Sequence, residues 1–107
     1  MRNLLIKRER AFAGCFGKMK VYLQDPDKPE LTIKGCPCRK LGELKNGEEK
    51  TFEIPEESVW VFVIGDAATK DFCVDGKLIP SGSGEVHLKG KTVMDPEKGN
   101  PFRFDKE

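Results

Sequence analysis

Apolar and polar residues alternate strictly in short segments along most of this chain of 107 residues. Met19, Val21 and Leu23 form one such segment, and Leu4 and Ile6 belong to another. Successive side chains of a β-strand point to opposite faces, so this pattern predicts strands with one buried and one solvated face. No comparable stretch shows the apolar period of about 3.6 residues that an amphipathic helix needs. The alternation therefore predicts an all-β protein.

Turn residues separate these segments at regular intervals. Seven Pro and eleven Gly divide the chain into about eight short strands, a spacing typical of sandwiches. We therefore expect one domain, residues 1–107, folded as a two-sheet sandwich of seven or eight mostly antiparallel strands. The stretch 65–71 is the only place where we expect a helical turn.

Particular turns follow from particular residues. Asn46-Gly47 and Asp75-Gly76 predict two-residue hairpins, because both central residues of a type I′ turn need positive φ. The segments 25–28 and 95–98, both of the form Asp-Pro-acid-Lys, predict type I turns. The segment 81–84, Ser-Gly-Ser-Gly, is interpreted as a hairpin loop.

The segment Val59–Ile64 differs from the others because all six of its residues are apolar. Such a run is typical of a central strand covered on both faces, and it is far shorter than the roughly 20 residues that span a bilayer. The predicted core takes one face of each alternating segment and residues of this run. It comprises Leu4, Ile6, Met19, Val21, Leu23, Ile33, Phe52, Ile54, Trp60, Phe62, Ile64, Val86, Leu88, Phe102 and Phe104.

The net charge of +1 hides a local asymmetry. Residues 1–20 carry +5 and residues 43–57 carry −4. The near-zero sum argues against a binder driven by bulk charge, whether of nucleic acid or of membranes. These two oppositely charged segments could pair within the fold or between copies of the chain, although charged side chains often simply cover a solvated face.

Two features predict a cytoplasmic location. Leu4-Leu5-Ile6 is shorter than the roughly 7–15 apolar residues of a secretory signal. Four cysteines are too few for a disulfide scaffold, so we expect free thiols.

Cys36 and Cys38, with Cys15 and Cys73 elsewhere in the chain, form the candidate thiol or zinc site. Zinc prefers four nitrogen or sulfur ligands, but a second closely spaced cysteine pair is missing. The alternative is that these cysteines are small buried residues. His87 falls on the polar face of its strand, so we expect no metal ligand there.

A second candidate site is a basic face. Lys18, Lys20 and Tyr22 share the outward side of one predicted strand, where bases of single-stranded nucleic acid could stack. The alternative is an edge strand that its lysines protect from pairing with other chains. Because no nucleic-acid motif accompanies this basic face, we do not expect nucleic acid as the partner.

Catalytic patterns are missing from the sequence. With a single histidine in an ordinary strand context, a nucleophile–histidine unit is not indicated. The segment 81–84 lacks the Gly-Lys-Ser/Thr end of a phosphate loop. We expect no enzyme and no cofactor. Trp60 is assigned to the core, but a surface-facing Trp60 beside Tyr22 or Phe62 could stack on a sugar.

The segment Leu41–Pro55 contains a G-x-L-x-N-G hairpin pattern followed by an x-F-x-I-P strand end, and Ile79-Pro80 begins an I-P-x-G turn. In these motifs the chain resembles PEGA-like β-sandwich domains of bacteria. The resemblance implies an immunoglobulin-like (Ig-like) sandwich with a binding or scaffolding role and no catalytic residues. We therefore expect a non-enzymatic binding or protein-interaction module, with self-association through an uncovered strand edge as one form.

Overall fold

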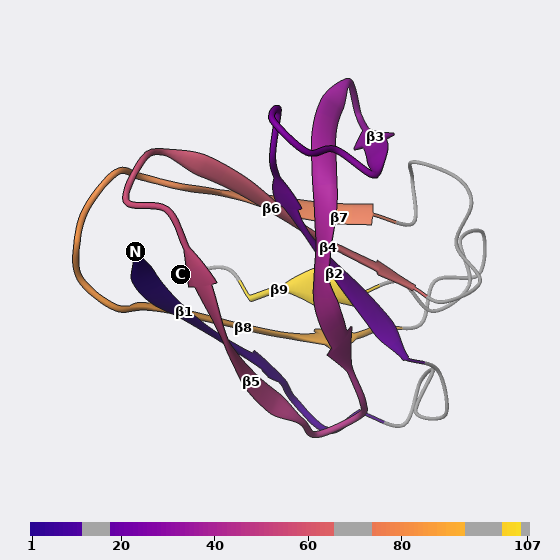
Figure 1. Ribbon diagram of the computed structural model, residues 1–107. Helices are drawn as coiled ribbons and strands as arrows, with labels where there is room; N and C mark the ends of the chain where they lie inside the picture. The colour runs from indigo at the N-terminus through magenta and orange to yellow at the C-terminus, as the bar shows by residue number, and fades with distance from the viewer. Residues whose placement is uncertain (12–17, 66–73, 94–101, 106–107) are drawn as a thin grey trace.

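The computed structural model describes residues 1–11, 18–65, 74–93 and 102–105, which form nine strands in two sheets (Figure 1). The four-stranded sheet has the order β5-β1-β8-β9, and the five-stranded sheet has the order β3-β4-β2-β6-β7. The strands are β1 (Arg2–Arg8), β2 (Met19–Gln24), β3 (Leu31–Ile33), β4 (Cys36–Leu44), β5 (Glu49–Ile54), β6 (Val59–Gly65), β7 (Val74–Ile79), β8 (Val86–Thr92) and β9 (Phe102–Phe104). The predicted all-β, two-sheet sandwich is confirmed, and among the described strands only β1 and β8 pair in parallel.

The strand β1 lies in the middle of the four-stranded sheet, between β5 and β8. Its pairing with β5 brings the basic start of the chain against the acidic segment 43–57, with Lys7 opposite Glu49. Arg2 is buried and its Nε donates to the carbonyl of Pro55 at 2.9 Å. Arg8 is also buried, and its guanidinium donates to the carbonyl of Leu44 at 2.9 Å. The opposite charges of these two segments therefore meet within the fold.

The main core lies between the two sheets. Seven predicted members are buried there: Leu4, Ile6, Met19, Val21, Leu23, Ile54 and Phe102. Four more are half-buried and pack against it: Phe52, Val86, Leu88 and Phe104. The alternation thus assigned the inward face correctly in five of the strands, β1, β2, β5, β8 and β9.

The predicted core is wrong for β6. Val59, Val61 and Val63 face the main core, whereas Trp60 is exposed and Phe62 lies in a second cluster on the other side of the sheet. Because both faces of this strand are apolar, only its neighbours decide which face turns inward. The remaining two predicted core residues, Ile33 and Ile64, also belong to the second cluster.

A tight hairpin builds this second cluster on the outer face of the five-stranded sheet. Lys34 and Gly35 have φ of 50° and 79° and join β3 to β4 as a two-residue turn, the type I′ geometry that sequence reasoning missed. Behind the turn, Ile33 and Cys38 pack against two aromatic side chains, Tyr22 and Phe62.

The turn at Asn46-Gly47 exists but is not a hairpin. Glu48 N donates to Lys45 O at 2.9 Å, and Gly47 has a φ of 78°. The strands on its two sides belong to different sheets, because β5 pairs with β1. The predicted pairing across this turn is therefore wrong.

Asp75-Gly76 is not a hairpin either, since it lies inside β7 and Gly76 pairs with Phe62 of β6. The segment 81–84 joins β7 to β8 in the other sheet, so it too is not a hairpin loop.

The predicted Asp-Pro turn at 25–28 is held by Asp25, whose Oδ1 accepts hydrogen bonds from the amides of Asp27 and Lys28, each at 3.1 Å. The guanidinium of Arg39, 2.8 Å from the other carboxylate oxygen, holds the pKa of Asp25 below its ordinary value of 3.8. The predicted turn at 95–98 and the helical turn predicted within 65–71 lie outside the described residues, apart from Gly65, which ends β6. No membrane-spanning helix occurs in the part of the chain that the structure describes.

Candidate binding surfaces

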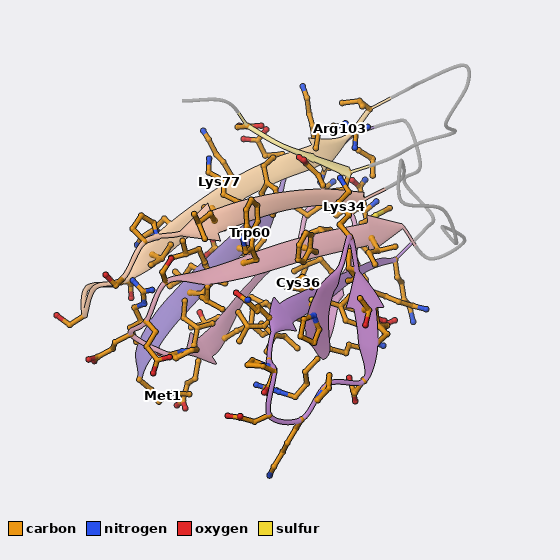
Figure 2. The ribbon with its side chains drawn as sticks, turned by 90° about the horizontal axis from the view of Figure 1, so that it is seen from above. Met1, Lys34, Cys36, Trp60, Lys77 and Arg103 are labelled. Atoms are coloured by element: carbon orange, nitrogen blue, oxygen red, sulfur yellow. The ribbon has the colours of Figure 1, made fainter. Side chains whose placement is uncertain are left out.

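The outer face of the five-stranded sheet carries an apolar region around Trp60, which Figure 2 labels, and we call this region the aromatic face. Its exposed side chains are those of Trp60 and Leu78, and the nearly buried Phe62, Gly76 and the half-buried Cys36 lie beside them. Trp60 and Leu78 are paired across β6 and β7 and are 39% and 48% exposed. The indole of Trp60 stacks on the ring of Phe62, with centroids 5.8 Å apart and planes 12° apart.

A cavity of about 430 Å³ opens on this face between the tip of the β3–β4 hairpin and the strands β6 and β7. Trp60, Phe62 and Gly76 provide its apolar lining, and Lys34 provides a charged group. Asp75 also borders the cavity, but its carboxylate accepts a hydrogen bond from Phe104 N at 2.7 Å on the other side of the sheet. Gly76 keeps the cavity open at Phe62, because a Cβ at this position would lie 2.6 Å from two ring carbons. The arrangement suits an apolar or aromatic group that enters beside Trp60 while a polar neighbour bonds to Lys34.

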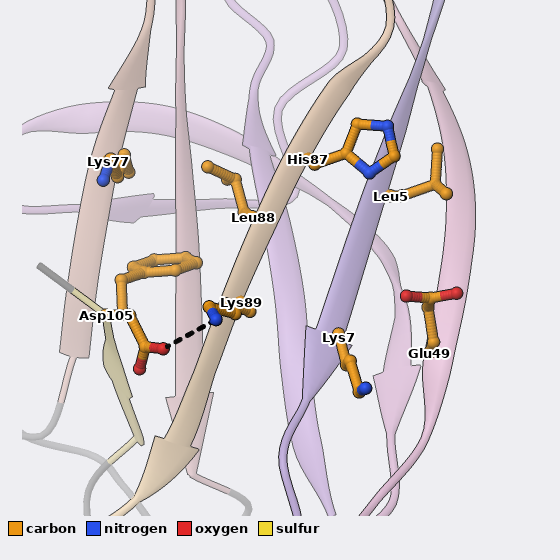
Figure 3. Close-up of a pocket in the computed structure, with 9 residues that line it drawn as sticks. Leu5, Lys7, Glu49, Lys77, His87, Leu88, Lys89 and Asp105 are labelled. Carbon is orange, nitrogen blue, oxygen red and sulfur yellow. Dashed lines mark ion pairs between the residues drawn. The ribbon is translucent and has the colours of Figure 1, made fainter. Parts of the chain in front are cut away.

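A second cavity, of about 480 Å³, lies around β8 and is called here the lysine slot (Figure 3). On one side of β8 the slot is lined by Lys77 of β7 and by Phe104 and Asp105; on the other side lie Leu5, Lys7 and Glu49. The slot thus joins the outer face of the four-stranded sheet to the opening between the sheets.

Cationic side chains outnumber carboxylates in the lysine slot. Lys7, Lys77 and Lys89 line it together with only two carboxylates, those of Glu49 and Asp105. Lys89 Nζ lies 3.9 Å from Asp105 Oδ2 and 3.8 Å from Glu9 Oε1. Surface ion pairs of this length are weak and exchange readily, so these lysines can also attract an anionic ligand.

The predicted thiol site is only partly within the described residues, because Cys15 and Cys73 lie outside them. Cys36 and Cys38 are free thiols; Cys36 is half-buried and Cys38 is fully buried. Burial, and to a lesser extent the neighbouring Cys36 thiol, raises the pKa of Cys38 to about 12. This sulfur therefore stays protonated at neutral pH, whereas metals bind the thiolate. Among the described residues no three His, Cys, Asp or Glu side chains are placed to hold a metal ion.

The structure keeps Lys20 and Tyr22 on one face of β2, as predicted, opposite Ile64 and Phe62 of β6, whereas Lys18 precedes the strand. Lys18 is exposed, Lys20 is half-buried, and Tyr22 is a member of the second cluster and is 8% exposed. The ring of Tyr22 thus offers little surface on which a base could stack. The alternative of a lysine-protected edge strand is wrong, because β2 lies between β4 and β6 inside its sheet.

His87 is exposed on β8, as predicted, and its Nε2 lies 2.6 Å from Glu85 Oε1. The chain's only histidine thus has a carboxylate for a neighbour.

Comparisons with family models, with curated proteins and with solved structures found no match to this chain.

Proposed function

We propose that this protein is a non-enzymatic protein-interaction module that docks its partner on the aromatic face. The exposure of Trp60 and Leu78 side by side on a sheet carries this proposal. A residue of either type alone on a surface is ordinary. Here the two lie side by side and Trp60 also lines a preformed cavity. Tryptophan is among the residues that most often dominate binding energy at interfaces.

The rigidity of the site supports a docking role. Trp60 lies on a strand paired on both sides, its amide donates to Gln24 Oε1 at 3.2 Å, and its ring is stacked on Phe62. A partner therefore meets a preorganised surface and loses little binding energy to ordering it.

The cytoplasm is the proposed location, supported by the free thiols of Cys36 and Cys38. The thiol or zinc site and the nucleic-acid interface stay secondary predictions, with the burial of Cys38 and Tyr22 counting against each. Self-association through a strand edge also stays a prediction. The opposite charges of residues 1–20 and 43–57 do not support self-association, since β1 and β5 of these two segments pair within one copy of the chain.

The test is a selection of peptides from a display library on the wild-type protein. Selected peptides should bind the Trp60→Ala and Leu78→Ala variants at least about tenfold more weakly, since interface hot spots cost roughly 2 kcal/mol or more. Leu31→Ala is the matched control, because Leu31 is 37% exposed but lies on β3. Peptides that bind Trp60→Ala as tightly as wild type would contradict the proposal, provided that circular dichroism shows the variant folded.

A further inference from the structure

Among the described strands, none pairs with the first half of β8 on one of its two sides. Along its other side, β8 pairs with β1 from Val86 to Gly90. On the β9 side, pairing covers only Gly90–Thr92, and one further bond runs from Asp105 N to Lys89 O at 2.9 Å. Among the described residues no strand pairs with Val86–Leu88 on this side. Within the part of the chain that the structure describes, the sheet thus has an unfilled strand position in line with β9.

The backbone at this position is oriented to accept a strand. The carbonyl of Lys89 faces the β9 side, while the carbonyl of Gly90 faces the β1 side and accepts from Glu9 N at 2.7 Å. Backbone polar groups of successive strand residues point alternately to the two sides. The amide and carbonyl of His87 therefore point, like those of Lys89, into the unfilled position.

The lysine slot surrounds this unfilled position. His87, Leu88 and Lys89 of β8 all line the slot, and Asp105, which follows β9, closes one end. Figure 3 shows Lys77 of β7 across from Leu88, with Asp105 below them. The open backbone edge of β8 and the lysine slot therefore lie at the same place.

We propose that the lysine slot binds an extended peptide as an added strand on β8, with alternating apolar and acidic residues. This site is separate from the aromatic face. Side chains of an added strand alternate between two directions. Those on the inner side meet the half-buried Leu88 and Phe104, which favour apolar residues. Those on the outer side share a face with Lys89 and Lys7, which favour carboxylates.

A polypeptide fits this position better than a small anion does. The unfilled edge presents an amide donor and a carbonyl acceptor of one residue, and a strand provides the matching pair at the right spacing. Lys7, Lys77 and Lys89 then set the preferred charge of the peptide, because rim charges mainly govern partner choice and association rate.

The test measures binding of a fluorescein-labelled peptide that alternates glutamate and valine to the full chain, by fluorescence anisotropy. We expect saturable binding that weakens as salt is added, because the rim charges are exposed. A peptide alternating lysine and valine should not bind. The glutamate–valine peptide methylated on the backbone nitrogens that face β8 should also fail, since it cannot donate to the sheet.

Variants of β8 locate the site. Lys89→Glu should weaken binding about tenfold through loss of attraction and added repulsion. Lys91→Glu, on the same strand and also exposed but beside β9, should leave it nearly unchanged. His87→Pro removes only the donor on the open side, which a sheet edge tolerates, and should abolish binding. Hydrogen exchange at the His87 amide in the wild type should slow when peptide is added.

Several outcomes would overturn the proposal. These are equal binding of the methylated peptide, unchanged exchange at His87, and peptide binding that requires removal of residues 106–107. If sedimentation shows that the chain self-associates, and hydrogen exchange at the His87 amide slows with that association in the absence of peptide, the edge is assigned to self-association instead.

Discussion

Replacement of Gly76 by alanine tests how the aromatic face is built. A Cβ at this position would lie 2.6 Å from Cδ1 and Cε1 of Phe62, whereas ordinary van der Waals contact begins at 3.4 Å. The ring would have to move by about 0.8 Å to restore that contact. Phe62 has little room for this movement, because it is only 4% exposed and stacks on Trp60.

The expected cost of Gly76→Ala is about 2 kcal/mol, within the roughly 1–3 kcal/mol typical of overpacking in a well-packed site. For a domain of this size each kcal/mol lowers the melting temperature by roughly 4–8 °C. The variant should therefore melt about 10 °C below wild type.

Urea unfolding followed by circular dichroism and by the fluorescence of Trp60, the chain's single tryptophan, measures this cost. Gly84→Ala is the control, because a Cβ there has no atom within 4 Å. The double variant Gly76→Ala with Phe62→Leu should recover part of the loss, since the clashing ring is gone. Equal stability of Gly76→Ala and Gly84→Ala, or no coupling with Phe62→Leu, would refute the proposed packing.

Three further predictions concern other positions. Gly90→Ala should destabilise the fold more than Gly76→Ala does and leave most molecules unfolded. Its Cβ would lie 2.3 Å from the backbone carbonyl oxygen of Arg103, which cannot rotate away. A circular dichroism spectrum of a folded variant would contradict this. Lys34→Asn should stabilise the protein by about 0.5–1 kcal/mol in urea unfolding, since asparagine tolerates the positive φ of this turn better than lysine does; a loss of stability would contradict it. The thiol of Cys38 should stabilise the folded state fully below pH 9.0, its ordinary pKa, and progressively less as the pH rises toward about 12, because only the unfolded thiol ionises in that range. Comparison of wild type with Cys38→Ala across this range checks it, and parallel stability profiles would show that the pKa is not raised.

The inward face of the four-stranded sheet could be predicted from alternation alone. In β1 the same alternation places Arg2 and Arg8 on the face of Leu4 and Ile6, and both arginines are indeed buried. Their burial was missed because charged residues are assigned to the surface by default. Backbone carbonyls, which no sequence pattern reveals, accept their hydrogen bonds.

The orientation of β6 could not be predicted, because both of its faces are apolar. What decides it is the neighbours: Phe62 lies between Tyr22 and Gly76, where the missing side chain of glycine leaves room for an aromatic ring. Such a match joins residues distant in sequence. The exposed position of Trp60, and with it the aromatic face, follows from that match.

Local signals identified turns more reliably than strand partners. Asn46-Gly47 does form a turn, yet β5 pairs with β1 rather than with β4, since its apolar face is buried against the main core from the other sheet. The lysine slot could not be predicted from the sequence for the same reason. It is lined by residues of β1, β5, β7 and β8 that only the pairing of distant segments brings together.

The place of β1 between β5 and β8 has a kinetic consequence. β1 is synthesised first, but β8, its parallel partner, lies near the opposite end of the chain. Contacts between such distant residues slow folding, because a long loop must close before they can form. While the chain is being made, Leu4 and Ile6 have no sheet to enter, and exposed apolar strands of this kind are prone to aggregate. Folding of the four-stranded sheet is therefore a late event that requires nearly the whole chain.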